Sequence, residues 1–509
     1  MLPSNVSGRT SHSFGVLVIL LLLSVLLVAA FVLISVPEEM LTLLAGGILG
    51  FVVCLVLGGK SILGIIEAVF IIGYFQGAIE LFVTLPISLG ILKYALLLGG
   101  GVFWLLRLMI SKRLRISRRV LAFAGLCLLF YVLFARMMVP AWRKGEVDIE
   151  LLTEMISLWA VFNIPLALLV YFDLKEITPV YDFLRTVVWL GIFAAAVGLG
   201  QYLIGPNRLQ ALGIDVYNMR FALLQSDEVS EFRVFSTFQS HYEFASFMVL
   251  SILAKLVLQF RAHRRPGMSS LITFFLLLGG LLVTFNITLW LTLAASVGVM
   301  LLGMWGKGMR VLLSKKAWRL AFATLILGLL ALIVIPPFRD RVVGIFAFEK
   351  GAVGTAGRSL YWRTEILKNN LGLIKEFPGG LGPTAKSAIS LLQARRGWFA
   401  TTSDVFFAWL SLVGGIPLFL SYLLLWIVPL SVSFRCRGRI PTTDRPLFWA
   451  IWALLFVGVV LGGVSNAALL NGTPTNLLTW ASLGVLLKVV DQFSKQTQQR
   501  SYNGESQMY

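Results

Sequence analysis

The chain has 509 residues, of which 58% are hydrophobic and 13% are charged, and its formal net charge is +19. Soluble domains carry about twice that charged fraction, so the composition excludes an ordinary soluble globular protein. The basic residues are scattered among short segments between apolar stretches. This pattern disfavours nucleic acid as the partner and favours anionic lipid headgroups and phosphate-bearing lipids.

Apolar stretches recur along nearly the whole chain, and about 20 such residues suffice for a helix that crosses a membrane. The first stretch, 14–35, is longer than the roughly 7–15 apolar residues of a signal peptide and lacks a clear cleavage site, so we expect a membrane helix there. The sequence predicts an all-α, polytopic integral membrane protein with about 14 transmembrane helices. The expected spans are 14–35, 40–58, 62–82, 87–110, 120–140, 150–171, 184–204, 242–260, 270–285, 288–305, 318–336, 405–430, 446–464 and 475–490.

The short apolar stretches 270–285 and 288–305 predict a tight helical hairpin that turns near Phe285–Thr288, rather than one long helix. No internal repeat of fixed period is visible along the chain, and no pair of Gly/Pro-interrupted helices occupies corresponding halves. Such paired broken helices are typical of many transporters, so their absence from the sequence disfavours that class.

Four short segments rich in Lys and Arg fall on the same side of the membrane under this assignment of spans: 112–119, 261–265, 307–319 and 435–445. Basic loops of this length stay in the cytoplasm. We therefore expect a protein of the bacterial inner membrane with both termini in the cytoplasm. The expected parts are N-terminal membrane helices (1–204), a first periplasmic loop (205–240), central membrane helices (241–337), a large, partly helical periplasmic loop (338–403), C-terminal membrane helices (404–490) and a cytoplasmic tail (491–509).

The larger external loop is unusually basic. The positive-inside rule concentrates Lys and Arg in cytoplasmic loops, so it does not explain basic residues in a loop on the other side. The bland interpretation is a solvated loop, because long loops cross the membrane regardless of charge. The functional interpretation is an anion-binding site. Its basic residues are Arg339, Arg341, Lys350, Arg358, Arg363, Lys368, Lys375, Lys386, Arg395 and Arg396, against Asp340, Glu349, Glu365 and Glu376.

The first external loop leads from Arg233 through Gln239 to His241 and Glu243, where the chain re-enters the membrane. A guanidinium has forked donors that match phosphate oxygens, so Arg233 is a candidate anion ligand; the alternative is an arginine that snorkels to the interface. Ionisable groups near the membrane are functional candidates. A carboxylate at a helix start has a second interpretation, because it complements the helix dipole. Both interpretations of His241 and Glu243 stay open.

A second set of polar residues lies in the large loop. The segment from 357 to 376 predicts an amphipathic helix carrying Arg358, Trp362 and Arg363, ended by the Pro378–Gly382 turn. Trp362 offers an apolar face to a sugar ring, or anchors the loop at the interface. Asp404 is another carboxylate at an external helix start. The chain has no P-loop, nucleophile elbow, zinc-type His pair or dinucleotide fingerprint, and its cysteines are not placed for a disulfide or a metal site, so no cofactor and no metal is expected.

The order of these segments resembles the superfamily of O-antigen ligases and Wzy-type polysaccharide polymerases, which are O-antigen ligase-like membrane glycosyltransferases. Residues 233–246 are similar to the family's Arg followed by Gly/Ser-Thr-Phe before a membrane helix. Arg358 with Trp362 and then 378–382 resembles the family's Arg and Trp before a Pro-x-Gly-x-Gly turn. Residues 403–418 are similar to its motif after the large loop. Ser403 stands where ligases characteristically have a His, and the hairpin lacks their Ser-Arg, which favours a polymerase.

The resemblance implies transfer of a glycan from undecaprenyl pyrophosphate to a sugar hydroxyl, at the periplasmic face, in O-antigen or exopolysaccharide synthesis. Arg233 and Arg358, then Arg363 and Arg341, are expected to bind the pyrophosphate, and Trp362 and Gln239 the sugar. Glu243, Asp404 and His241 compete for the role of base. The implied partners are lipid-linked donor and acceptor glycans and membrane lipid, with a flippase and chain-length regulator of the same pathway as further candidates.

Three other functions stay open from the sequence. A ligase would transfer the glycan to another acceptor, such as the lipid A core. A flippase for lipid-linked oligosaccharides also suits about 14 helices and a basic cavity, although the charges cluster at helix ends on one face. A structural scaffold is the third alternative, but it would not explain why the external loop is basic.

Overall fold

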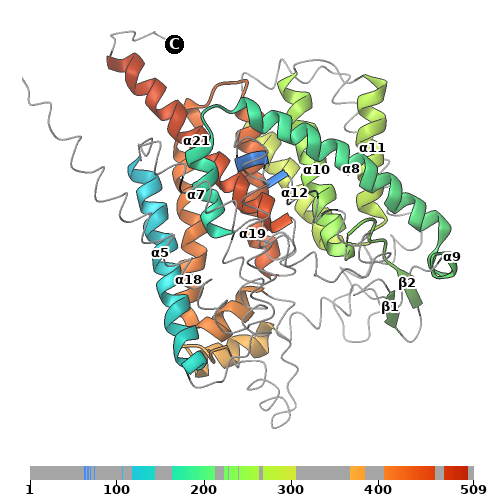
Figure 1. Cartoon of the computed structure of the whole chain (residues 1–509), viewed down its shortest axis with the longest axis horizontal. Helices are drawn as coiled ribbons and strands as arrows, with labels where there is room; N and C mark the ends of the chain where they lie inside the picture. The colour runs from blue at the N-terminus through green and yellow to red at the C-terminus, as the bar shows by residue number, and fades with distance from the viewer. Residues whose placement is uncertain are drawn as a thin grey trace, which may run out of the picture.

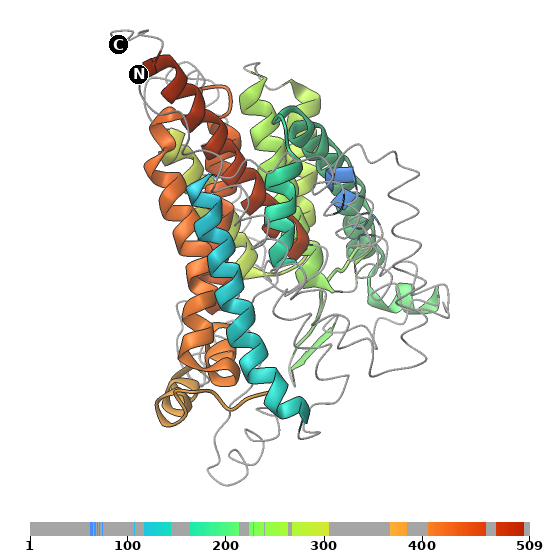
Figure 2. The ribbon, with the colours of Figure 1, turned by 60° about the vertical axis from the view of Figure 1, so that its left-hand side comes forward.

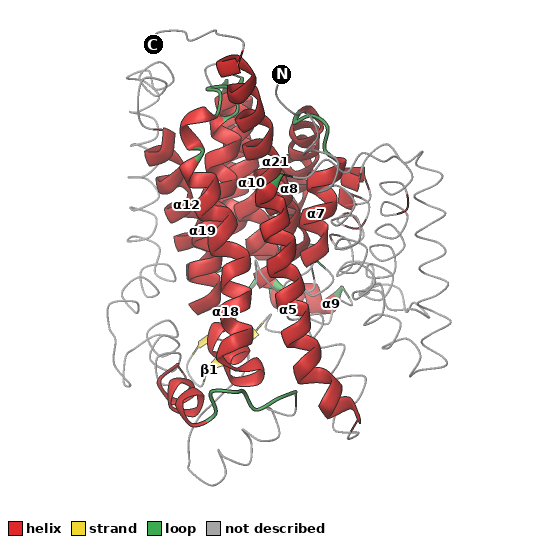
Figure 3. Cartoon of the chain, turned by 90° about the vertical axis from the view of Figure 1, so that its left-hand side faces the viewer, coloured by secondary structure: helices red, strands yellow, loops and turns green. Residues whose placement is uncertain are grey.

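A computed structural model describes residues 62–64, 66–67, 69, 71, 74, 106, 117–143, 163–212, 223–226, 229–238, 240–262, 267–304, 367–383, 406–464 and 475–502. Apart from one short antiparallel hairpin, the regular structure in these residues is helical (Figures 1 and 3). The membrane-type helices are α5 (Arg118–Arg143), α7 (Ile164–Asp173), α8 (Thr178–Ile204), α10 (His241–Arg261), α11 (Met268–Leu282), α12 (Ile287–Met304), α18 (Phe406–Arg435), α19 (Arg445–Val464) and α21 (Thr475–Tyr502).

Shorter elements connect these helices. The short helix α9 (Pro206–Ala211) follows α8, and the hairpin of β1 (Leu223–Ser226) and β2 (Val229–Phe232) leads towards α10, with Leu223 opposite Phe232. A further helix covers 367–376, and the 3₁₀ turn η1 (Arg437–Arg439) joins α18 to α19. The hairpin was not expected from the sequence, because each of its strands has four residues and no regular alternation marks them.

Six of the described helices, α5, α8, α10, α12, α18 and α21, are long and apolar enough to cross a membrane, and α7, α11 and α19 contain shorter apolar helices. The chain is therefore a helical, membrane-embedded protein with several spans. The expected spans at 14–35, 40–58 and 318–336 lie outside the described residues, and only Leu106 of the span 87–110 is described, so the total of about 14 stays a prediction.

The predicted tight turn between two short helices is confirmed, but α11 and α12 do not pack along each other as the helices of a hairpin would; instead, α10 contacts both of them. Helix α11 ends at Leu282 and α12 begins at Ile287, with a tight turn between them. Asn286 Oδ1 accepts a hydrogen bond from the Leu289 amide (3.2 Å), which caps α12. Phe285 adopts φ +52°, a conformation that a turn this short requires.

Several helices differ from the expected spans, among them α7, which begins at Ile164 whereas the expected span begins at 150. Helix α8 begins at Thr178, earlier than 184, because Pro179 suits the first helical turn and extends the helix past the apolar stretch. Helix α21 continues to Tyr502, beyond 490, since hydropathy falls there while the helical backbone does not end. Helix α18 contains a break at Gly415, whose φ is +74°.

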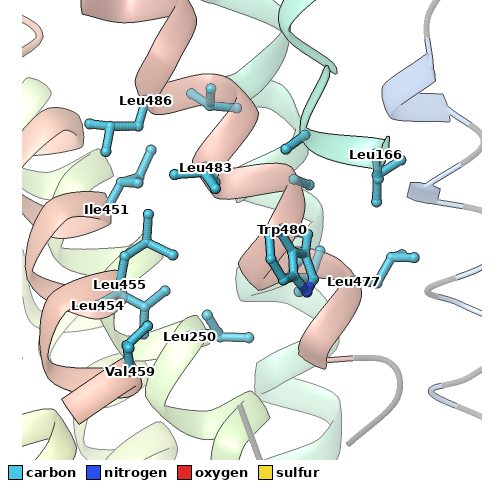
Figure 4. Close-up of a cluster of buried hydrophobic side chains, with 14 of the residues drawn as sticks. Leu166, Leu250, Ile451, Leu454, Leu455, Val459, Leu477, Trp480, Leu483 and Leu486 are labelled. Carbon is cyan, nitrogen blue, oxygen red and sulfur yellow. The ribbon is translucent and has the colours of Figure 1, made fainter. Parts of the chain in front are cut away.

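The core of the bundle forms where α21 lies between α7 and α19, and Figure 4 shows Trp480 and Leu483 of α21 among leucines of its neighbours. The rings of Trp480 and Trp426 are 4.2 Å apart, and both side chains are fully buried. Gly484 permits the close approach of α7, because a Cβ there would collide with the carbonyl oxygen of Ala167.

The bundle has two ends, which we call the Arg261 end and the His241 end after the two ends of α10. At the Arg261 end, the guanidinium of Arg261 lies 3.4 Å from the ring of Tyr181, and Tyr181 donates a hydrogen bond to Asp444 (2.7 Å). At the His241 end, the ring of Tyr202 lies 6.0 Å from that of Phe285. Figure 2 shows α5 and α18 running side by side along the bundle.

The basic segments expected on one side of the membrane share the Arg261 end where they are described. Arg119 donates to Ser494 (2.8 Å), and Tyr171 donates to Asp491 (2.8 Å) one turn earlier on α21. Residues 174–177 join α7 to α8, so Tyr171 and Tyr181 lie at the same end of the bundle. The hydrogen bonds of these two tyrosines, together with the Arg119–Ser494 bond, therefore place 118–119, 261 and 435–445 at that end. The fourth basic segment, 307–319, lies outside the described residues.

Candidate functional site

The start of α10 carries two of the residues singled out in the sequence. Ser240 has an extended backbone (φ −145°, ψ 154°), and its hydroxyl accepts a hydrogen bond from the amide of Glu243 (3.3 Å). Ser240 is thus the N-cap, and Glu243 lies in the first turn of the helix. This position suits a carboxylate that complements the helix dipole, and it also leaves Glu243 at the His241 end, beside the other candidates.

Arg233 and His241 form a direct contact. Arg233 Nη1 lies 3.1 Å from His241 Nε2, and the imidazole is buried (1% exposed). A guanidinium has donors and no acceptor, so Nε2 must accept the hydrogen bond. The ring proton then belongs on Nδ1, which is buried and has no hydrogen-bond partner within the described structure. The pair therefore presents a guanidinium and a buried imidazole N–H together.

The loop that carries Arg233 is held against α8 by Ser236. Its backbone amide donates to Gln201 Oε1 (2.8 Å), and Gln201 Nε2 donates to the Ser236 carbonyl (2.9 Å). The Ser236 hydroxyl also donates to the carbonyl of Ala194 (2.8 Å). These bonds hold Ser236 at φ +56°, a left-handed conformation that a non-glycine residue rarely adopts. The turn reverses the chain so that Arg233 meets His241.

Buried aromatic residues fix the same loop from the other side. Phe238 is fully buried, with its ring 5.1 Å from that of Tyr74 and 5.4 Å from that of Phe247. Tyr74 in turn donates to the carbonyl of Leu190 in α8 (2.8 Å). The loop is therefore anchored by three hydrogen bonds at Ser236 and by an aromatic cluster at Phe238, which makes the Arg233–His241 geometry rigid.

Two of the stretches singled out in the sequence meet in space. The amides of Leu381 and Gly382 donate to the carbonyls of Leu412 (2.6 Å) and Val413 (3.0 Å), and the amide of Ile416 donates to Pro378 (3.0 Å). The break of α18 at Gly415 exposes these backbone groups, and the Pro378–Gly382 turn satisfies them. The large loop is thus joined by its backbone to a membrane helix.

The helix over 367–376 contains a polar residue that the sequence reasoning missed. Leu367 packs on Ala408 at the start of α18, and Leu373 is part of the main core. Asn370, on the same face, is 1% exposed, and among the described residues neither its side-chain nitrogen nor its oxygen has a hydrogen-bond partner. Gln201 was missed as well, although an amide inside an apolar span is itself a signal of function or close packing.

The other predicted site residues cannot be placed. Among the described residues no group of three or more His, Cys, Asp or Glu side chains is arranged to hold a metal ion. The residues that lie outside the described structure are Gln239, Arg341, Arg358, Trp362, Arg363 and Asp404.

The fold and these contacts define a class: a helical membrane protein with a fixed Arg–His pair at one end of its bundle. Neither a protein family nor a curated protein matches this chain.

Proposed function

We propose that the protein is a membrane glycosyltransferase that polymerises undecaprenyl-pyrophosphate-linked oligosaccharide repeat units into O-antigen or exopolysaccharide at the periplasmic face. The observation that best supports this proposal is the Arg233–His241 pair, which combines a permanent positive charge with a buried N–H donor. A leaving pyrophosphate gains negative charge in the transition state, and fixed donors of this kind stabilise such charge without a metal.

The proposed reaction exchanges one bond at the anomeric carbon for another and transfers one proton. The oxygen of an acceptor hydroxyl attacks the anomeric carbon of the donor sugar, and the bond from that carbon to the pyrophosphate oxygen breaks. The electron pair leaves with undecaprenyl pyrophosphate, and the hydroxyl proton passes to a base. Arg233 and, in the proposal, Arg358 hold the pyrophosphate, with Arg363 and Arg341 as further ligands, while Trp362 and Gln239 contact sugar.

The contact between Arg233 and His241 distinguishes His241 from the other two candidate bases. His241 Nε2 already accepts a hydrogen bond from Arg233, so His241 is better suited to donate from Nδ1 to a phosphate oxygen than to remove a proton. Glu243, two residues further along α10, and Asp404 are then the candidate bases. A base must come within hydrogen-bonding distance of the acceptor hydroxyl, and a carboxylate in the first turn of α10 lies at the correct end.

A second observation that supports the proposal is the set of backbone hydrogen bonds between 378–382 and 412–416. The resemblance places a pyrophosphate ligand upstream of this turn and a polar motif just before α18. A loop that is hydrogen-bonded to a membrane helix holds such residues in fixed positions relative to lipid-linked substrates.

The experiment is polymerisation by purified protein in liposomes that contain undecaprenyl-pyrophosphate repeat units, read as the size distribution of lipid-linked glycan. Arg233→Ala is expected to lower the rate by about 10²–10³-fold, the usual cost of one charge-stabilising donor. Arg233→Lys keeps the charge but loses the forked donors, so an intermediate rate is expected. Arg208→Ala removes an exposed arginine of α9, just after α8, and serves as the matched control.

The outcomes separate the candidate functions. A ladder of repeat-unit multiples that Arg233→Ala abolishes and Arg208→Ala preserves supports the polymerase. Transfer of preformed glycan to lipid A core, with no ladder, indicates a ligase. Unchanged single units that move between leaflets indicate a flippase.

A further inference from the structure

The connection between α18 and α19, at the Arg261 end, carries three exposed arginines within five residues: Arg435, Arg437 and Arg439. The last residue of α18, Arg435, and the 3₁₀ turn η1 hold them on a short, defined backbone, in which the Arg439 amide donates to the Cys436 carbonyl (3.0 Å). The side chains are therefore presented together rather than spread along an extended loop.

In the part of the chain that the structure describes, no carboxylate is paired with these arginines. Within the described structure, neither Arg435 nor Arg439 takes part in an ion pair or a side-chain hydrogen bond, while Arg437 donates to the Phe434 carbonyl (3.0 Å). The nearby Asp444 instead accepts hydrogen bonds from Tyr181 (2.7 Å) and Thr443 (3.4 Å). Three positive charges consequently remain available to an anion that approaches from outside the protein.

An exposed apolar face of α18 leads directly to this cluster. Leu420, Leu424, Ile427 and Phe434 are 49%, 37%, 51% and 38% exposed, and their spacing of four, three and seven residues puts them on one face of the helix. From Leu424 to Phe434 the helix rises about 15 Å, which is the depth of one leaflet of hydrocarbon. The guanidinium of Arg437 lies 4.0 Å from the Phe434 ring, at the boundary between the apolar face and the charges.

We propose that this surface, Arg435, Arg437 and Arg439 together with the exposed face of α18, is a binding site for an anionic membrane phospholipid. The arginines bind the headgroup phosphodiester by forked, charge-assisted hydrogen bonds, and an acyl chain lies along Leu424 and Ile427. The charge of the cluster selects an anionic lipid over a zwitterionic one. The site is at the opposite end of α10 from Arg233 and His241, so it does not depend on the proposed function.

The test measures retention of phosphatidylglycerol by purified, delipidated full-length protein in native mass spectrometry, beside phosphatidylcholine with the same acyl chains. Replacing all three arginines with glutamine is expected to weaken phosphatidylglycerol binding about fivefold per residue, or roughly a hundredfold in total. The triple Arg→Lys variant keeps the charge and is expected to retain most of the binding. Arg185→Gln is the matched control, because Arg185 is exposed in α8 near the same end but is already paired with Asp182 (2.7 Å).

Three results would overturn the proposal. Equal phosphatidylglycerol binding by the wild type and the triple glutamine variant would show that the arginines do not hold the headgroup. Equal retention of phosphatidylcholine would show that chain contacts alone act. Displacement of the lipid by millimolar inorganic phosphate would indicate a site for free anions. Circular dichroism checks that each variant is folded. If the triple variant is unstable, the single variant Arg439→Gln replaces it, and this variant is expected to bind phosphatidylglycerol about fivefold more weakly than the wild type.

Discussion

Gly380 and Gly415 lie so close that a Cβ on Gly380 would stand 2.5 Å from the backbone nitrogen of Gly415. Both residues have positive φ, +88° and +74°, which only glycine adopts readily. The contact joins the turn after the 367–376 helix to the break in α18. Hydrogen bonds from Leu381 and Gly382 close the joint on one side, and the bond from Ile416 to Pro378 closes it on the other. Two glycines far apart in the chain thus fix how the large loop sits on the membrane bundle.

Gly380→Ala is therefore expected to lower the free energy of unfolding by about 2 kcal/mol or more, because the Cβ adds left-handed strain and a clash with backbone. The measurement is the thermal unfolding midpoint in detergent. Gly379→Ala is the control, since a Cβ on Gly379 meets nothing within 4 Å and φ is not positive there. Equal midpoints for the two variants would mean that the joint contributes little.

Ser236 gives a second prediction, because its strain and its hydrogen bond can be separated. Ser236→Ala and Ser236→Gly both remove the hydroxyl that donates to Ala194, but glycine accepts φ +56° without cost. We expect the glycine variant to be more stable than the alanine variant by about 1 kcal/mol. Chemical unfolding of the two proteins measures the difference, and an alanine variant as stable as the glycine variant would contradict the left-handed turn.

The sequence predicted the helices around the site well and the contacts within it poorly. The turn at Phe285 and the start of α10 follow from apolar stretches bounded by polar capping residues, which are local signals. The pairing of Arg233 with His241 depends instead on the turn at Ser236, and that turn is held by Gln201, 35 residues away. No local pattern encodes a contact of this kind.

The loop helix illustrates the same limit. The sequence predicted an amphipathic helix over 357–376, but its charged and aromatic residues gave no reason to expect that Asn370 would be buried. Its burial arises because Leu367 and Leu373, three residues to either side, pack on α18 and the core. The apolar spacing was visible in the sequence, but the element that would cover it was not.

Asn370 itself supplies a third prediction. Burying an amide with no hydrogen-bond partner costs free energy, so Asn370→Leu, which has a similar volume, is expected to stabilise the protein by about 1–3 kcal/mol. Lys375→Leu, on the exposed side of the same helix, is the control and is expected to change stability little. Thermal unfolding of both variants provides the comparison. If Asn370→Leu destabilises the protein instead, the amide makes an interaction in the folded state.

The orientation of the bundle can be tested at its two ends. The basic segments at the Arg261 end are expected to face the cytoplasm, so α9, beyond the opposite end of α8, is expected to face the periplasm. Gly438 in η1 has open space around its Cα, and Asn207 in α9 is exposed, so each accepts a cysteine in a background whose three native cysteines are alanine. A membrane-impermeant maleimide is expected to label Asn207→Cys in intact cells with a permeabilised outer membrane, and Gly438→Cys only after lysis. Labelling of Gly438→Cys from outside would invert the bundle and move Arg233 and His241 to the cytoplasmic face, where periplasmic glycan transfer cannot occur.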